Sequence, residues 1–274
     1  MAPRRYVLDA ILVRAAVAAG ATVRTGVTAT GVLRDDDGRV RGVLARTPDG
    51  VDLRLSAGVV VGADGVRSRM AGLFGAPVRE SFAADSATWY AYVAGLPWRG
   101  FEYHPGPRGF AGVFPTHDGE ACVWICGPTA AVADAPRDFT GALARISPSL
   151  AARVRTGHLT SRVRGTAGLP NHLRRAAGPG WALVGDAGYH RDPVSGHGIT
   201  DAFRDAELLA EHIDDLGGYE RRRDDAARDV FAITREMTRY PAPEQFVALQ
   251  RRLATALDVE ADELASRNRE GALV

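Results

Sequence analysis

Lysine is absent from this chain of 274 residues, because all 34 of its basic side chains are arginine. Neither a lysine Schiff base nor a lysine general base is therefore available within the chain. The arginines nearly balance the 33 acidic residues, and the resulting net charge of +1 argues against nucleic acid as the main partner. Apolar residues make up 46% of the chain and charged residues 24%, an ordinary globular composition that excludes wholesale disorder.

Cysteine and long apolar runs are scarce as well. Cys122 and Cys126 are the two cysteines; on one strand they would share a face and lie too far apart to bridge. No Cys/His spacing indicates a metal site, so we expect two reduced thiols and no bound metal. No segment approaches the roughly 18 apolar residues of a membrane span, and Asp9 and Arg14 interrupt the apolar stretch near the N-terminus. These features predict a cytoplasmic protein without a membrane span.

Hydrophobic periodicity predicts the secondary structure. Apolar residues recur with helical spacing over 8–19, and Gly20 follows as a C-cap. A short strand is predicted at 21–24. Three antiparallel strands joined by Asp-Gly turns are predicted at 27–33, 40–47 and 51–55. The apolar run before Gly62 is typical of a buried parallel strand.

The pattern changes after residue 78. Short alternating runs up to residue 128 predict an antiparallel sheet, followed by a helix over 137–154 and a strand over 159–164. A second short apolar strand is predicted at 181–184 and a helix at 199–213. Charged helices are predicted beyond Gly218, with a frayed tail at 268–274. Strands of parallel character thus flank an antiparallel insert, which indicates an α/β or mixed α+β fold.

Two loops carry features of a ligand site. The first, Gly62-Ala63-Asp64-Gly65, follows the first apolar strand, and its glycines allow a diphosphate to approach the backbone. An ordinary turn is the alternative, because Asp-Gly also occurs at three other places. The second loop, Gly185-Asp186, follows the second apolar strand, and Asp186 can accept hydrogen bonds from the hydroxyls of a ribityl or ribose chain.

Pro193, Gly196 and Gly198 come next and open a helix. Its free N–H groups suit a ligand that develops negative charge, such as a reduced flavin. A simply capped helix entry is the alternative here.

Together these segments resemble the Asp-Gly and Gly-Asp motifs of the class A FAD-dependent monooxygenases, the para-hydroxybenzoate-hydroxylase-like flavoproteins. Order and spacing match over about residues 4–215. The resemblance implies that Asp64 serves the FAD phosphate and ribose side, that Asp186 binds the ribityl chain, and that Pro193 and the following loop lie beside the flavin ring. The implied cofactor-binding residues are Arg5, Val27, Asp64, Gly65, Gly185, Asp186, Pro193, Gly196, His197, Gly198 and Ile199; it assigns no catalytic residue.

The sequence departs from that family at several points. The histidine of the family's Gly-Asp-Ala-Ala-His motif falls on Tyr189, its asparagine after Gly-x-Gly on Thr200, and the arginine that closes the Asp-Gly motif on Ala71. The 274 residues contain no Gly-x-Gly-x-x-Gly sequence, the element that holds the FAD pyrophosphate. We therefore expect an N-terminally truncated FAD-binding domain.

The resemblance implies a parallel-sheet FAD-binding domain (1–77 and 176–216), an antiparallel substrate domain (78–175) and C-terminal helices (217–274). It predicts FAD, reduced by NAD(P)H, and oxygenation of a small organic substrate. Alternatives are a prenyl-chain reductase, a flavin halogenase, or a non-catalytic, partner-dependent remnant. Eight aromatic residues of the middle segment are either substrate-lining or sheet core: Trp89, Tyr90, Tyr92, Trp98, Phe101, Tyr103, Phe114 and Trp124.

Overall fold

The computed structural model describes residues 1–107 and 109–271. The chain forms two compact units. The first unit contains Met1–Thr25, Asp85–Leu169 and Thr238–Val247; the second contains Gly26–Ala84, Pro170–Met237 and Ala248–Val274. The predicted mixed α/β fold class is confirmed. These units are defined by packing, and the predicted division into cofactor and substrate domains stays a prediction.

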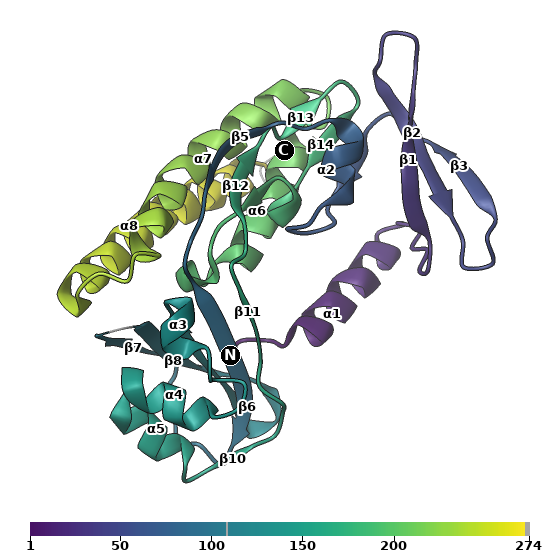
Figure 1. Ribbon diagram of the computed structural model, residues 1–274. Helices are drawn as coiled ribbons and strands as arrows, with labels where there is room; N and C mark the ends of the chain where they lie inside the picture. Colours follow the sequence, from purple (N-terminus) through teal and green to yellow (C-terminus); the bar gives the residue numbers. More distant parts are fainter. Residues whose placement is uncertain (108, 272–274) are drawn as a thin grey trace. The chain divides into compact units, whose positions relative to one another are not determined.

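An antiparallel sheet of six strands dominates the first unit, as predicted for residues 78–128 (Figure 1). Its strand order is β10 (His158–Leu159), β6 (Ala87–Ala94), β9 (Glu120–Gly127), β8 (Gly109–Pro115) and β7 (Glu102–Gly106), with β11 (Arg164–Ala167) also paired to β6. Helix α1 (Arg5–Ala18) belongs to this unit, where Tyr6 Oη lies 3.1 Å from His117 Nε2.

One face of this sheet is the core of the first unit. Alternate residues such as Ala91, Val113, Val123 and Ile125 are completely buried against three short helices. These helices are α3 (Thr129–Val132), α4 (Phe139–Ile146) and α5 (Pro148–Val154). The single helix predicted over 137–154 is wrong: Ser147 accepts a hydrogen bond from the Leu150 N–H and caps a new helix, in which Pro148 occupies the first turn.

The opposite face of the sheet is aromatic. The strand register places Arg164, Tyr90, Trp124, Gly112 and Tyr103 in one row across five strands. The Trp124 ring lies so close over Gly112 that a Cβ there would approach it to 2.3 Å, so the row requires glycine. Of the eight aromatic candidates, Trp89 packs against the core, whereas Tyr90, Tyr92, Tyr103, Phe114 and Trp124 are on the aromatic face.

The second unit contains the strands that precede the two motif loops. A three-stranded antiparallel meander of β1 (Thr28–Arg34), β2 (Val40–Arg46) and β3 (Asp52–Ser56) confirms the predicted hairpins, but residues 21–24 form no strand. Next to it, β4 (Val60–Gly62) runs parallel to β14 (Trp181–Leu183), which also pairs with β13 (Ala177–Gly178). Phe74 of α2 (Arg69–Phe74) stacks on Trp181 with ring centroids 5.0 Å apart.

The remaining elements of this unit support that small sheet. β5 (Val78–Phe82), β12 (Asn171–Arg174) and β15 (Tyr189–His190) form a third sheet. Helices α6 (Gly198–Glu211) and α7 (Leu216–Met237) follow, and α8 (Pro243–Gly271) continues from the first unit into the second. Of the predicted frayed tail, residues up to 271 are helical and 272–274 lie outside the described residues. Within the described residues, each helix is too short or too polar to span a membrane.

Candidate cofactor site

The two motif loops leave the sheet side by side. Leu183 is opposite Gly62 in the parallel register, and the Val184 N–H donates to the Gly62 carbonyl at 3.0 Å. A Cβ at position 62 would lie 2.7 Å from the Leu183 side chain and 2.9 Å from Met70, so glycine permits this close packing. The Asp64 and Asp186 loops therefore begin at the same carboxyl edge, where open α/β sheets bind ligands.

The Asp64 carboxylate is held within its own loop. It accepts hydrogen bonds from Ser68 Oγ at 2.5 Å and from the N–H groups of Arg69 and Met70 at 2.7 and 2.9 Å. Burial raises the pKa of Asp64, but the hydrogen bonds from Ser68 and the backbone outweigh it and lower the pKa overall. Gly65 follows with a φ of +81° and open space at its Cβ position. Asp64 thus fixes the loop, while Gly65 leaves its surface bare.

Around Asp186, glycine again permits the backbone conformation of the loop. Gly185 and Gly196 have φ values of +55° and +74°, in the region that favours glycine. At the start of α6, a Cβ on Gly198 would lie 3.9 Å from Asp186 Oδ1 and near nothing else. The half-buried Asp186 carboxylate therefore lies beside the N-terminus of α6, with unfilled space between them.

A buried ion network below this loop was not anticipated from the sequence. Asp205 accepts the Gly185 N–H at 3.0 Å and Arg204 Nη2 at 2.8 Å, while Asp201 accepts Arg204 Nη1 at 3.1 Å. Arg191 Nε also donates to Asp201 at 2.8 Å. Burial raises the pKa of Asp205 although Arg204 opposes the shift. The sequence signal that could have revealed this network is helical spacing, because residues 201, 204, 205 and 208 form one buried stripe of α6.

This network matters for the electrostatics of the α6 N-terminus. Asp201 is in the first turn, where a free carboxylate would repel an approaching anion. It is instead 3% exposed and faces two arginines, so the positive end of the helix is not cancelled by it.

Arg174 and His172 lie next to the Gly-Asp loop. Arg174 Nη1 donates to the Ala187 carbonyl at 2.7 Å and to His172 Nε2 at 2.9 Å. Burial, followed by the charge of Arg174, lowers the pKa of His172 to about 4, so the imidazole is neutral at pH 7. Burial lowers the pKa of Arg174 and the Asp64 charge opposes that change. Arg174 thus brings a positive charge to both loops.

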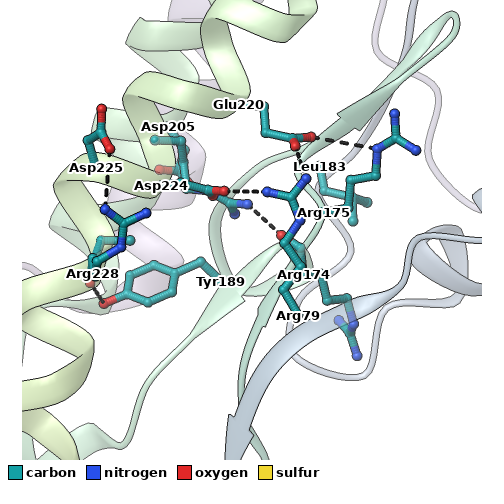
Figure 2. A network of polar contacts seen from close by, with 12 residues as sticks. Arg79, Arg174, Arg175, Leu183, Tyr189, Asp205, Glu220, Asp224, Asp225 and Arg228 are labelled. Carbon is teal, nitrogen blue, oxygen red and sulfur yellow. Dashed lines mark hydrogen bonds and ion pairs between the residues drawn. The ribbon is translucent and has the colours of Figure 1, made fainter.

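Helix α7 braces the strands that carry the site (Figure 2). Tyr219 Oη donates to the Leu183 carbonyl at 2.6 Å, and Arg223 Nη2 donates to the Arg174 carbonyl at 2.6 Å. Arg79 of β5 donates to Asp224 at 2.7 Å and also pairs with Glu220. These contacts tie the end of β14, the end of β12 and β5 to one rigid helix.

The structure also places the other predicted site residues. Pro193 is in the turn η3 (Pro193–Ser195). His197 occupies the N-cap position of α6 without a capping hydrogen bond from its side chain, and Ile199 is in the first turn, half-exposed beside Gly198. Burial lowers the pKa of His197. Val27 immediately precedes β1 in the same unit. Arg5 belongs to α1 of the first unit and pairs with Asp9 one turn along, so its contact with a cofactor stays a prediction.

The departure at Tyr189 has a structural consequence. The Tyr189 ring is 1% exposed, and the Arg204 guanidinium lies over it at 5.5 Å from the ring centroid. Next to it, His190 lies with Nδ1 2.6 Å from the Pro170 carbonyl. Both side chains at this point of the motif are therefore part of the protein interior.

The residues present fit the ribityl and flavin side of FAD. Gly65, Gly196 and Gly198 leave open space at the carboxyl edge of the sheet, a cradle that side chains would fill, and Asp186 borders it. Asp186 supplies an acceptor for hydroxyl groups, and the α6 N-terminus supplies N–H donors for a ring edge that becomes negative.

Comparison with known proteins identifies the family of the chain. The chain matches the FAD binding domain family over residues 3–230. It is 28% identical over 218 residues to a digeranylgeranylglycerophospholipid reductase of Methanosarcina mazei, covering 76% of this chain and 51% of that protein. The chain thus spans about half the length of this relative.

Solved structures share the fold. A triple mutant of the flavin-dependent brominase Bmp2 superposes with a TM-score of 0.75 at 20% identity, over 96% of this chain and 76% of that one. PqsL of Pseudomonas aeruginosa, described as a probable FAD-dependent monooxygenase, superposes with a TM-score of 0.62 at 24% identity, over 85% of this chain and 66% of that one. With the family match over most of its length, this chain belongs to the FAD binding domain family.

Proposed function

We propose that this chain is part of an FAD-dependent monooxygenase that takes electrons from NAD(P)H and hydroxylates a small organic substrate in the cytoplasm. The observation that carries the proposal is the shared sheet edge: the Asp64 and Asp186 loops begin opposite each other, and the glycine-bare N-terminus of α6 lies beside Asp186. The FAD-binding-domain match and the monooxygenase-like neighbour PqsL support it.

The chain's own residues have separable tasks in this proposal. Asp186 accepts hydrogen bonds from the ribityl hydroxyls and so fixes the flavin along the sheet edge. The first N–H groups of α6 would stabilise negative charge on a bound ring, because their dipoles are already oriented. When bound, the flavin supplies hydride acceptance from NAD(P)H and the activation of oxygen.

The buried ion network holds the Gly-Asp loop and the start of α6 in position relative to each other. Asp205 holds the Gly185 N–H, and Arg191 holds Asp201 of α6, so the Gly-Asp loop and the helix start are fixed to each other through fully buried ion pairs. Such preorganisation reduces the entropy that a flexible loop would lose on binding.

A titration of the 274-residue chain with FAD tests the cofactor assignment. We expect Asp186→Ala to weaken FAD binding by ~1–3 kcal/mol, the cost of losing a charge-assisted hydrogen bond. Asp229→Ala, an exposed carboxylate of α7, is the matched control and should bind FAD like the parent. Equal FAD affinities for the two variants would refute the assignment of Asp186.

A reductase is the second candidate, favoured by the names of the curated relatives. The two activities differ in their use of oxygen. A monooxygenase consumes one O₂ for each NAD(P)H oxidised with substrate, whereas a prenyl-chain reductase saturates a double bond without O₂. Oxygen uptake measured against NAD(P)H oxidation separates the two when hydrogen peroxide is measured as well, because reduced flavin that is reoxidised without oxygenating a substrate returns the consumed O₂ as peroxide. A monooxygenase consumes O₂ in excess of the peroxide formed, and a reductase does not.

A further inference from the structure

A cavity lies at the amino-terminal edge of the parallel strands β4 and β14, opposite the edge where the Asp64 and Asp186 loops begin. Its volume is about 590 Å³, within the range of small-molecule sites. Residues just before β4 and β14 line it, together with the end of α6 and the start of α7. Because β4 lies between this cavity and the Asp64 loop, the cavity is separate from the candidate cofactor site.

The cavity has a rigid wall. The carbonyls of Pro179 and Gly180 accept the N–H groups of Val40 and Val60 at 2.9 and 3.0 Å, which joins β2, β4 and the start of β14. Gly180 has a φ of +75°, and a Cβ there would lie 2.0 Å from the Val40 carbonyl oxygen. The wall is therefore closely packed backbone that is preformed for a ligand.

The lining combines charged and apolar side chains. Arg39, Arg175 and Arg221 line it together with Asp214 and Glu220, and Val59, Ile213 and Leu216 supply apolar surface. Glu220 is already occupied, because it accepts the Ala177 N–H at 3.0 Å and pairs with Arg79 and Arg175 (Figure 2). Arg221 is at the rim, 3.5 Å from the exposed carboxylate of Asp215.

Arg39 differs from the arginines around it. Arg41 donates to Asp35 at 2.7 Å, and Arg34 donates to the Gly38 carbonyl at 2.8 Å. The Arg39 guanidinium makes neither an ion pair nor a hydrogen bond within the described residues, and its Nε is buried without an acceptor. A partly buried cation without a counter-charge is costly, and an anionic ligand in the cavity would lower that cost.

We propose that this cavity binds an amphiphilic organic anion, with its carboxylate or phosphate head on Arg39 and Arg221 and its apolar body on Val59, Ile213 and Leu216. A guanidinium offers paired donors that match the oxygens of either head group. Asp214 is the opposing charge of the lining, so it limits the affinity. This site and its ligand are independent of the cofactor proposal, because no residue is shared between them.

Calorimetric titration of the 274-residue chain tests the proposal with two probes, octanoate and octyl phosphate. We expect one of them or both to bind with a stoichiometry of one, and comparison of the two identifies the head group. Inorganic phosphate, which lacks the apolar body, and octanol, which lacks the charge, should each bind ~tenfold more weakly or not at all. Equal binding of inorganic phosphate would overturn the amphiphilic assignment.

Variants locate the site. Arg39→Gln should weaken binding of the better probe ~tenfold, the loss of a charge-assisted contact, and Asp214→Asn should strengthen it. Arg222→Gln is the matched control, because Arg222 is an exposed neighbour of Arg221 on α7 that does not line the cavity. Arg39→Gln removes no ion pair or hydrogen bond within the described residues, so the urea midpoint should not fall below the parent value. Failure of both probes to bind, or equal affinities in Arg39→Gln and Arg222→Gln, would overturn the proposal.

Discussion

The backbone N–H of Gly185 donates to the Asp205 carboxylate at 3.0 Å, and Asp205 is completely buried. This contact joins the first residue of the Gly-Asp loop to the middle of α6, twenty residues further along. The hydrogen bond holds the glycine-containing loop in place, because the Asp205 carboxylate is itself held by its ion pair with Arg204.

Loss of the Asp205 charge should destabilise the protein strongly. Asp205→Asn leaves Arg204 buried with one counter-charge fewer, which is expected to cost about 3 kcal/mol of unfolding free energy. Asp225→Asn is the control, because Asp225 makes only an exposed pair with Arg228 at 3.6 Å, worth less than about 1 kcal/mol (Figure 2). Urea unfolding measures both variants. Equal midpoints would contradict a structural role of the buried network.

The two glycines before α6 should respond differently to valine. Gly196→Val places a β-branched residue at a φ of +74° and should cost about 1–2 kcal/mol of stability. Gly198 has an ordinary φ and open space, so Gly198→Val should cost less than about 1 kcal/mol yet weaken FAD binding, because its methyl groups extend into the space beside Asp186. Thermal unfolding and FAD titration of both variants check this. Normal FAD affinity in Gly198→Val would mean that the loop serves only as a helix entry.

Gly188 should be intolerant of alanine because of Arg223. An added Cβ would lie 3.0 Å from Arg223 Nη1 and 3.0 Å from the Leu183 Cβ, an overpacking expected to cost about 1–3 kcal/mol. Shortening the arginine should relieve part of this, so the loss in Gly188→Ala/Arg223→Met should be smaller than the sum of the single losses. A double-mutant cycle in urea measures the coupling. Additive losses would show that Arg223 does not restrict position 188.

Stability should fall as the solution is acidified between pH 6.5 and about 4. The folded-state pKa of His172 is about 4, below its ordinary value of 6.5, mainly because of burial. The unfolded chain therefore takes up a proton in this range that the folded chain does not, and the stabilisation present above pH 6.5 is lost as the pH decreases. His172→Gln should flatten the dependence of the unfolding free energy on pH, whereas the exposed His158→Gln should not. A parent-like slope in His172→Gln would assign the pH dependence to other groups.

The 274-residue chain should lose FAD on desalting. Most FAD affinity in dinucleotide-binding folds comes from a pyrophosphate held at a helix N-terminus by a Gly-x-Gly-x-x-Gly loop, and the sequence contains no such loop. The carboxylates of Asp64 and Asp186 cannot replace it because they repel a diphosphate. The visible spectrum after desalting in the absence of free FAD checks this. A stable, stoichiometric flavin band would contradict it.

Sequence patterns were sufficient for the elements that depend on local chemistry. Asp-Gly turns predicted the β1–β2–β3 meander and alternating residues predicted the antiparallel sheet, and both are present. The Gly-rich loops after two apolar strands indicated a cofactor site, which stays a prediction. Each of these depends on residues within one turn or one strand, so spacing alone reveals it. The break between α4 and α5 was also local, since Ser147-Pro148 is a cap and a helix start, and the continuous apolar periodicity concealed it.

Tertiary structure decided which charged residues are inside. Charged residues are typical of exposed helix faces, yet α6 and α7 bury three of them: Arg204, Asp205 and Arg223. The reason is that both helices pack against loops whose backbone N–H and C=O groups need hydrogen-bond partners. The same applies to Arg39, whose isolation depends on where β2 and α7 begin and where β13 ends. Burial and ion pairing between distant segments arise only when the chain is folded, and no local pattern in the sequence specifies them.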